Sequence, residues 1–244
     1  MIFVKFILPF IGLAILFTFI YFEYKKKYIF AVIFKGLASL CFLIMGIIFF
    51  INKSGDAKPL SNLILIGLIL GLLGDILLNL RFVVKPEIGN KIFILGVLSF
   101  LAGHILYLVH LIKFISVANN HHLIYIPIII AVLIDVFISY LIFTKLEVKL
   151  SNKIFGVVYI LAVSMMMTLS VFNMINGIIH PLNDNNLGYL LHLGIGGILF
   201  FASDVILIFN SFGKHPKFYL RISNLTLYYI GQLLISISIL LLNI

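Results

Sequence analysis

The chain has 244 residues, 63% of them hydrophobic, and a mean hydropathy of +1.26. A domain of this size cannot bury so much apolar surface in water, which excludes a soluble globular fold. The net charge of +9 does not indicate a nucleic-acid-binding protein, because Lys and Arg lie in short breaks between apolar runs rather than in a basic stripe with aromatic residues. The single cysteine, Cys41, excludes an intramolecular disulfide bond.

Eight apolar runs follow one another along the chain. Each is close to the roughly 20 residues that cross the hydrocarbon core of a bilayer. A backbone in lipid must satisfy its own hydrogen bonds, so each run is predicted to be a transmembrane helix. The main basic cluster, Lys25–Lys27, follows the first run, which favours a retained helix over a cleaved signal peptide. We therefore expect a single all-α membrane domain over residues 1–244, a bundle of eight transmembrane helices at about 6–22, 28–51, 60–80, 91–115, 122–144, 153–179, 187–210 and 219–243.

The basic residues are unevenly divided between the two ends of these helices. Twelve belong to the first, third, fifth and seventh breaks, four belong to the other side, and Lys35 lies inside a helix. The positive-inside rule then predicts that the odd-numbered breaks are cytoplasmic and that both termini are non-cytoplasmic. We expect the membrane to be the inner membrane of a bacterium.

Two parts of the sequence resemble each other weakly. The segment around Asp75 in the third run resembles that around Asp204 in the seventh, and the segment around His104 resembles that around Gln232. Asp75 and His104 are 29 residues apart, and Asp204 and Gln232 are 28 residues apart. Because rare polar residues align, the sequence favours two four-helix halves related by a pseudo-two-fold axis along the membrane normal. Chance similarity between apolar helices is the alternative.

Asp75 and Asp204 are the candidate catalytic residues. An ionisable side chain in mid-bilayer costs roughly 2.5–3.5 kcal/mol on insertion scales, so the presence of each aspartate indicates a structural or functional role. Glycines precede both, and small residues let helices approach closely, so we expect both carboxyl groups to face the interior and to meet in one cavity. A proton donor and an anion in one dry site suit cleavage through a cationic transition state. The alternative is that each carboxyl group forms a hydrogen bond near a helix end.

Lys35 lies about two turns inside the second apolar run, away from both of its ends. The functional interpretation is a cation that pairs with Asp75 or Asp204, or that holds a phosphate, with Ser39 one turn further on the same face. The alternative is a side chain that extends back to the membrane interface. Asp135 also lies in mid-membrane, and the sequence assigns it no role.

Polar side chains also lie on the fourth and eighth runs. His104 and Tyr107 are three residues apart on one helix face, and Tyr228, Gln232 and Ser236 form a stripe spaced by four. They are candidates for substrate binding, and inter-helix hydrogen bonding is the alternative. His104 is the one histidine deep in a run, whereas a zinc hydrolase needs several histidines and an acid. No metal site is expected.

Five short motifs occur in order from the second run to the eighth: Lys35 in Phe34–Leu37, Gly74–Asp75, Gly103–His104 with Tyr107, Gly197 to Ser203–Asp204, and Tyr228–Tyr229 with Gln232. In their order and spacing they resemble the YhhN, or lysoplasmalogenase-like, family of integral membrane proteins. The resemblance implies an eight-helix fold, no organic cofactor, and hydrolysis of the vinyl ether bond of lysoplasmalogens. The products would be a fatty aldehyde and glycerophosphoethanolamine or glycerophosphocholine.

The residues and the resemblance together predict an acid-catalysed ether hydrolase whose partners are a lysophospholipid substrate and the surrounding membrane lipids. Asp75 and Asp204 are expected to act as proton donor and cation-stabilising carboxylate, in an order that the sequence leaves open. Lys35 would hold the phosphate. The other predicted substrate-binding residues are His104, Tyr107, Tyr228, Tyr229 and Gln232.

Two other classes of protein remain as alternatives. One is a membrane transporter or lipid-binding protein for a small amphiphile, because repeated halves and central charged residues are also features of transporters. The other is a metal-dependent lipid amidase. The sequence predicts no oligomeric state.

Overall fold

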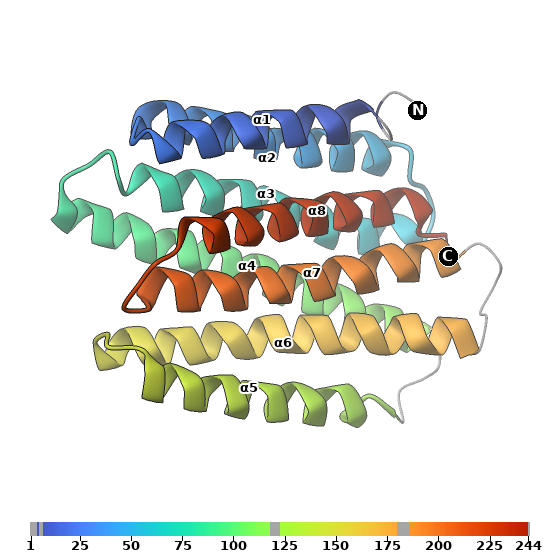
Figure 1. Cartoon of the computed structure of the whole chain (residues 1–244). Coiled ribbons are helices and arrows are strands. Elements are labelled where there is room, and N and C mark those ends of the chain that lie inside the picture. Colours follow the sequence, from blue (N-terminus) through green and yellow to red (C-terminus); the bar gives the residue numbers. More distant parts are fainter. Residues whose placement is uncertain (1–3, 5–6, 118–122, 180–185, 244) are drawn as a thin grey trace. The chain divides into compact units, whose positions relative to one another are not determined.

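The structure is a computed structural model and describes residues 4, 7–117, 123–179 and 186–243. Within these residues the chain is all-helical and contains no strand. The eight helices of the described residues confirm the eight predicted runs (Figure 1). They are α1 (Leu8–Tyr24), α2 (Tyr28–Ile51), α3 (Ala57–Leu80), α4 (Pro86–Val117), α5 (Tyr125–Lys145), α6 (Leu150–Ile179), α7 (Leu187–Phe212) and α8 (Phe218–Leu241).

The largest difference from the predicted bounds occurs at the start of α4, where proline begins the helix. α4 starts at Pro86, five residues before the predicted start, and α3 starts at Ala57 with Pro59 in its first turn. Proline is tolerated in a first turn, because the N–H group that it lacks has no partner inside the helix there. The apolar runs therefore mark the hydrocarbon-spanning parts of helices that extend beyond them.

Seven of the described helices, α2 to α8, are long and apolar enough to cross a membrane, and their apolar spans cover 21 to 30 residues each. Large apolar side chains also remain exposed on them, such as Leu133 and Phe137 of α5 at 64% and 63%. Lipid covers such side chains, whereas water would disfavour them. The fold is that of an integral, multi-pass membrane protein. α1 is apolar but has 17 residues, so its membrane crossing stays a prediction.

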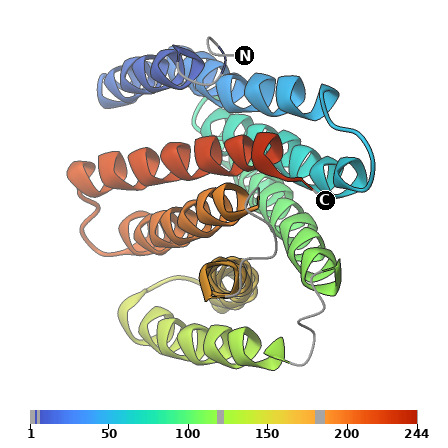
Figure 2. The same cartoon turned by 90° about the vertical axis from the view of Figure 1, so that its right-hand side faces the viewer.

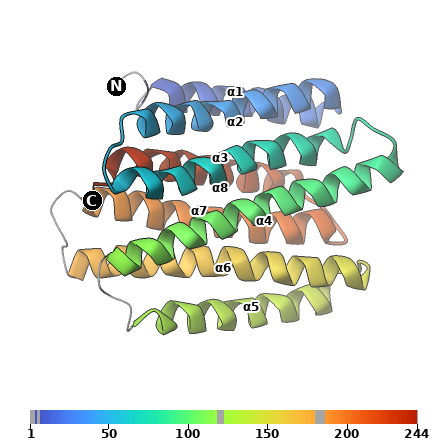
Figure 3. The ribbon, with the colours of Figure 1, turned by 180° about the vertical axis from the view of Figure 1, so that it is seen from behind.

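The chain forms two compact units, with a boundary inside α4 between Tyr107 and Leu108. In the first unit α1 packs on α2 and α2 on α3, and a short turn joins α3 to α4, which runs back in the opposite direction (Figure 3). In the second unit α5, α6, α7 and α8 each pack on the next (Figure 2).

Within the first unit, α3 and α4 approach closely at two glycines. A Cβ atom on Gly103 would lie 3.3 Å from the carbonyl oxygen of Gly67, and the Tyr107 ring occupies the space in which a side chain of Gly67 would stand. Gly67 precedes Asp75 by eight residues on α3. The contact between backbones holds the helix segment that carries Asp75 against α4.

Within the second unit, α7 and α8 make the matching contact. A Cβ atom on Gly231 would lie 3.1 Å from the carbonyl oxygen of Gly196, and a Cβ atom on Gly196 would lie 3.0 Å from Cγ1 of Ile235. Gly196 precedes Asp204 by eight residues. Each unit thus packs its aspartate-bearing helix on the next helix through the same positions of the weak sequence repeat. The pseudo-two-fold axis stays a prediction.

Candidate functional site

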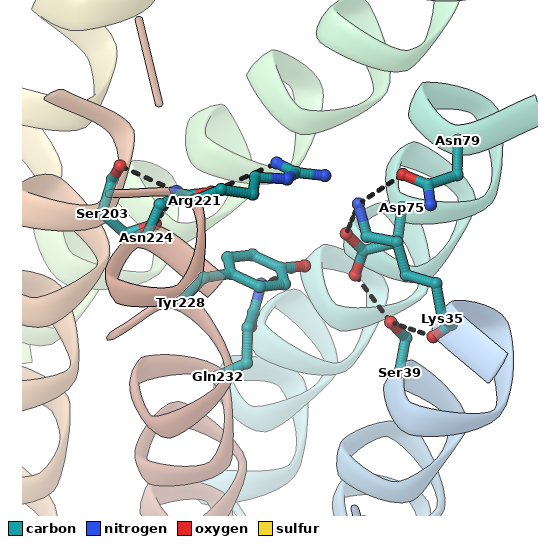
Figure 4. Close-up of polar contacts among 9 residues, drawn as sticks. All are labelled: Lys35, Ser39, Asp75, Asn79, Ser203, Arg221, Asn224, Tyr228 and Gln232. Atoms are coloured by element: carbon teal, nitrogen blue, oxygen red, sulfur yellow. Dashed lines mark hydrogen bonds and ion pairs between the residues drawn. The ribbon is translucent and has the colours of Figure 1, made fainter. Parts of the chain in front are cut away.

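Asp75 lies at the centre of a buried polar cluster between α2 and α3 (Figure 4). Its Oδ1 atom is 3.1 Å from Nζ of Lys35, and its Oδ2 atom accepts a 2.6 Å hydrogen bond from the hydroxyl group of Ser39. Nζ of Lys35 also lies 3.4 Å from Oδ1 of Asn79. The Lys35 and Asp75 side chains are 3% and 2% exposed, so each charge is neutralised by the other inside an apolar bundle.

Helical spacing explains how this cluster forms. Lys35 and Ser39 are four residues apart on α2, and Asp75 and Asn79 are four residues apart on α3, so each pair shares a helix face. α1 contributes Phe19, whose ring centroid lies 5.8 Å from Nζ of Lys35, within the range of a cation–π contact. Of the interpretations considered for Lys35, pairing with Asp75 is the one that the structure shows.

His104 and Tyr107 belong to the same unit as Asp75. Both are buried on α4, and their ring centroids lie 6.3 Å apart at an interplanar angle of 70°. Tyr107 packs its ring on α3 at Gly67. Its position is therefore fixed by the close approach of the two helices.

Asp204, in the second unit, is bound by α6. The hydroxyl group of Tyr159 donates a 2.6 Å hydrogen bond to Oδ2 of Asp204, and both residues are buried. The preceding residue, Ser203, is bound by α8: Nδ2 of Asn224 donates to its carbonyl oxygen and to its hydroxyl oxygen, each at 2.8 Å (Figure 4). The Ser203–Asp204 segment is thus tied to helices on either side of α7.

The predicted binding residues of α8 form an aromatic layer on α7. The Tyr228 ring packs edge-on against Phe200 at 5.2 Å and against Tyr229 at 5.0 Å, and Nε2 of Gln232 lies 3.4 Å from the Tyr228 hydroxyl oxygen. All of these side chains are buried. Phe200 precedes Asp204 by four residues, so the layer lies on the face of α7 that carries Asp204.

Asp75 belongs to the first unit and Asp204 to the second. Their predicted meeting in one cavity stays a prediction. Asp135 lies on α5 at 8% exposure, and its Oδ1 atom has no hydrogen-bond partner in the described part of the chain. Among the described residues, no group of three or more His, Cys, Asp and Glu could hold a metal ion.

Several residues of these clusters were not predicted. Asn79 could have been found, because it is a polar residue four positions after Asp75. Nothing in the sequence indicated that Tyr159 belongs to the cluster around Asp204, since tyrosine is common in apolar segments. Arg221 was counted only among the basic residues of the seventh break, and its hydrogen-bond partner at 3.3 Å, Asn224, was assigned no role.

The fold and the two buried clusters define a multi-pass membrane protein with carboxylates embedded in its helices. A model of the YhhN family matches residues 30–239, most of the chain. The chain belongs to the YhhN family, as the motifs predicted. The curated proteins contain no match to it, and neither do the solved structures.

Proposed function

We propose that this YhhN family member is a membrane hydrolase that cleaves the vinyl ether bond of lysoplasmalogen-type lysophospholipids. The products are a fatty aldehyde and a glycerophospho-alcohol. The main support is the buried ion pair of Lys35 and Asp75, a fixed carboxylate inside a membrane-spanning bundle. A charged carboxylate is costly to bury in a membrane, so its presence indicates a function, and stabilisation of a cationic intermediate is such a function.

The chemistry requires one acid, one anion and one water molecule. A proton adds to the β-carbon of R–CH=CH–O–R′ and gives the cation R–CH2–CH=O⁺–R′. Water adds to the carbon beside the oxygen and loses a proton. The resulting hemiacetal breaks its bond to the glycerol oxygen, which gives R–CH2–CHO and HO–R′. The proton lost by water replaces the one that the acid donated, so no other reactant is consumed.

Asp75 suits the role of the anion. Asp75 forms an ion pair with Lys35, as an anion does. Lys35 contacts its Oδ1 atom and Ser39 donates a hydrogen bond to its Oδ2 atom. A carboxylate held in advance needs little rearrangement as the cation forms, which is the basis of electrostatic preorganisation.

Asp204 then takes the role of the acid. The Tyr159 hydroxyl group donates to Oδ2, so the transferable proton would be carried on Oδ1. After transfer, the same hydrogen bond stabilises the carboxylate until water returns the proton. Proton donation by a positioned acid contributes roughly 10²–10⁴-fold to a rate.

Transport is the competing function. Transporter sites are commonly built from helices that break near the midplane. α3 and α7 are continuous helices through Asp75 and Asp204. This continuity favours the hydrolase.

The test uses purified protein in proteoliposomes with a 1-alkenyl lysophospholipid and with its saturated 1-alkyl analogue. We expect aldehyde, detected by mass spectrometry, from the alkenyl lipid alone. The same vesicles are assayed for movement of both intact lipids. Intact movement without aldehyde would establish the transporter instead, and the absence of both would also overturn the proposal.

A further inference from the structure

Arg221 is tied to the Asp204 segment by a short chain of hydrogen bonds (Figure 4). Its Nη1 atom donates to Oδ1 of Asn224 at 3.3 Å, and Nδ2 of Asn224 donates to both oxygens of Ser203 at 2.8 Å. Asn224 is 4% exposed and Ser203 is fully buried, whereas Arg221 is half-buried. A buried amide therefore holds a cation that still reaches the surface.

The orientation of this amide is fixed by its neighbours. Ser203 supplies a carbonyl oxygen as acceptor, so Asn224 must turn its N–H groups toward α7 and its oxygen toward Arg221. A guanidinium group carries five N–H donors in a planar fork that matches the oxygens of a phosphate. Arg221 also lies in the first turn of α8, where the helix dipole favours an anion.

Lys35 is less suited to bind a phosphate. Its ammonium group is 3% exposed and contacts Asp75 and Asn79. A phosphate at this position would displace the buried carboxylate from its cation, which is costly in an apolar environment. Arg221 would bind the same anion without breaking that ion pair.

We infer that Arg221, positioned by Asn224 and Ser203, binds the phosphate of the lysophospholipid headgroup. The inference rests on the proposed function, in which the glycerol carbons place the ether oxygen a short distance from the phosphate. Ser203 and Asp204 are adjacent, so one end of the site holds the headgroup while the ether reaches the acid. The ligand class is a phosphate monoanion on a lipid.

The test measures binding of two probes that cannot be cleaved to the full-length protein in detergent. One is a 1-alkyl lysophosphocholine and the other is the matching 1-alkylglycerol, which lacks the phosphate. We expect the wild type to bind the phospholipid more tightly. Arg221→Gln should weaken phospholipid binding roughly tenfold or more, as expected for loss of a charged hydrogen bond, and leave the dissociation constant of alkylglycerol unchanged.

Lys214→Gln is the matched control. Lys214 lies in the loop before α8, is 62% exposed, and pairs with Glu147 at 2.8 Å, which raises the pKa of Lys214. This variant removes one charge near the same end of α8 and should bind both probes as the wild type does. An equal loss of phospholipid binding in the two variants would show a general charge effect and overturn the inference.

Two further results separate the possible explanations. Equal weakening of both probes by Arg221→Gln would mean a structural role and overturn the inference. Inorganic phosphate that displaced the phospholipid at concentrations below the phospholipid's own dissociation constant would assign the site to free phosphate, and this too would overturn the inference.

If the wild type releases no aldehyde but keeps Arg221-dependent phosphate recognition, the proposed function fails and the phosphate site stands. If the wild type releases aldehyde and Arg221→Gln leaves KM unchanged, the proposed function stands and the phosphate site fails.

Discussion

The ammonium group of Lys35 lies 3.1 Å from the carboxylate of Asp75, and both side chains are almost wholly buried. Removing one partner of such a pair leaves an unbalanced charge and typically costs about 3–5 kcal/mol. We expect Lys35→Met to lower the unfolding free energy by about this amount. The double variant Lys35→Met/Asp75→Leu should recover most of it, because no buried charge remains. Thermal unfolding in detergent measures the stability of the single and double variants. If the losses of unfolding free energy in the single variants added up in the double variant, the two charges would not be coupled.

The hydrogen bond from Tyr159 to Asp204 predicts that the Tyr159 hydroxyl group affects catalysis, although Tyr159 is 45 residues away in the sequence. Tyr159→Phe removes the donor but keeps the ring, so we expect kcat to fall roughly tenfold, the value of one hydrogen bond to a charged group, with little change in KM. Tyr140→Phe is the control, because Tyr140 is 65% exposed on α5. A Tyr159→Phe enzyme as active as the Tyr140→Phe control would remove this hydrogen bond from the mechanism.

The helices were predictable because apolar runs between charged breaks report directly on membrane crossing. α2 matches its predicted bounds, 28–51. The start of α4 was not predicted, since proline usually interrupts a helix and Glu87 is charged, although both residues are compatible with a first helical turn. Local periodicity also gave the shared faces of Lys35 with Ser39 and of His104 with Tyr107.

Contacts between helices were harder to predict than the helices themselves. Periodicity assigns a residue to a face but does not say which helix covers that face. Asp204 accepts a hydrogen bond from Tyr159, 45 positions earlier, and nothing in the sequence near either residue indicates the other. The glycines were informative because a missing side chain permits backbone contact, as Gly196 and Gly231 show.

The shared-site hypothesis predicts that positions 75 and 204 can be joined. Asp75→Cys and Asp204→Cys, in a Cys41→Ala background, should be linked by a short thiol cross-linker within one chain. Each cysteine alone, in the same background, is the control and should give no link within one chain. Mass spectrometry of the digested protein identifies the linked peptides. No link between positions 75 and 204 would contradict a common cavity.

Asp135 is expected to lower stability without contributing to catalysis. Its Oδ1 atom is buried with no hydrogen-bond partner among the described residues, and an unsatisfied buried polar group costs about 1–3 kcal/mol. Asp135→Leu should therefore raise the unfolding temperature in detergent and leave aldehyde release unchanged. Loss of activity at unchanged stability would give Asp135 a functional role instead.

Aldehyde release from a 1-alkenyl lysophospholipid by the wild type, Asp75→Asn and Asp204→Asn tests the central claim most directly. The unfolding temperature of each variant is measured alongside to confirm that it is folded. Both substitutions keep the size of the side chain and remove its charge or its acidic proton, so we expect each to lower turnover by about 10²-fold or more. A folded variant of either kind with near wild-type turnover would contradict catalysis by the two aspartates.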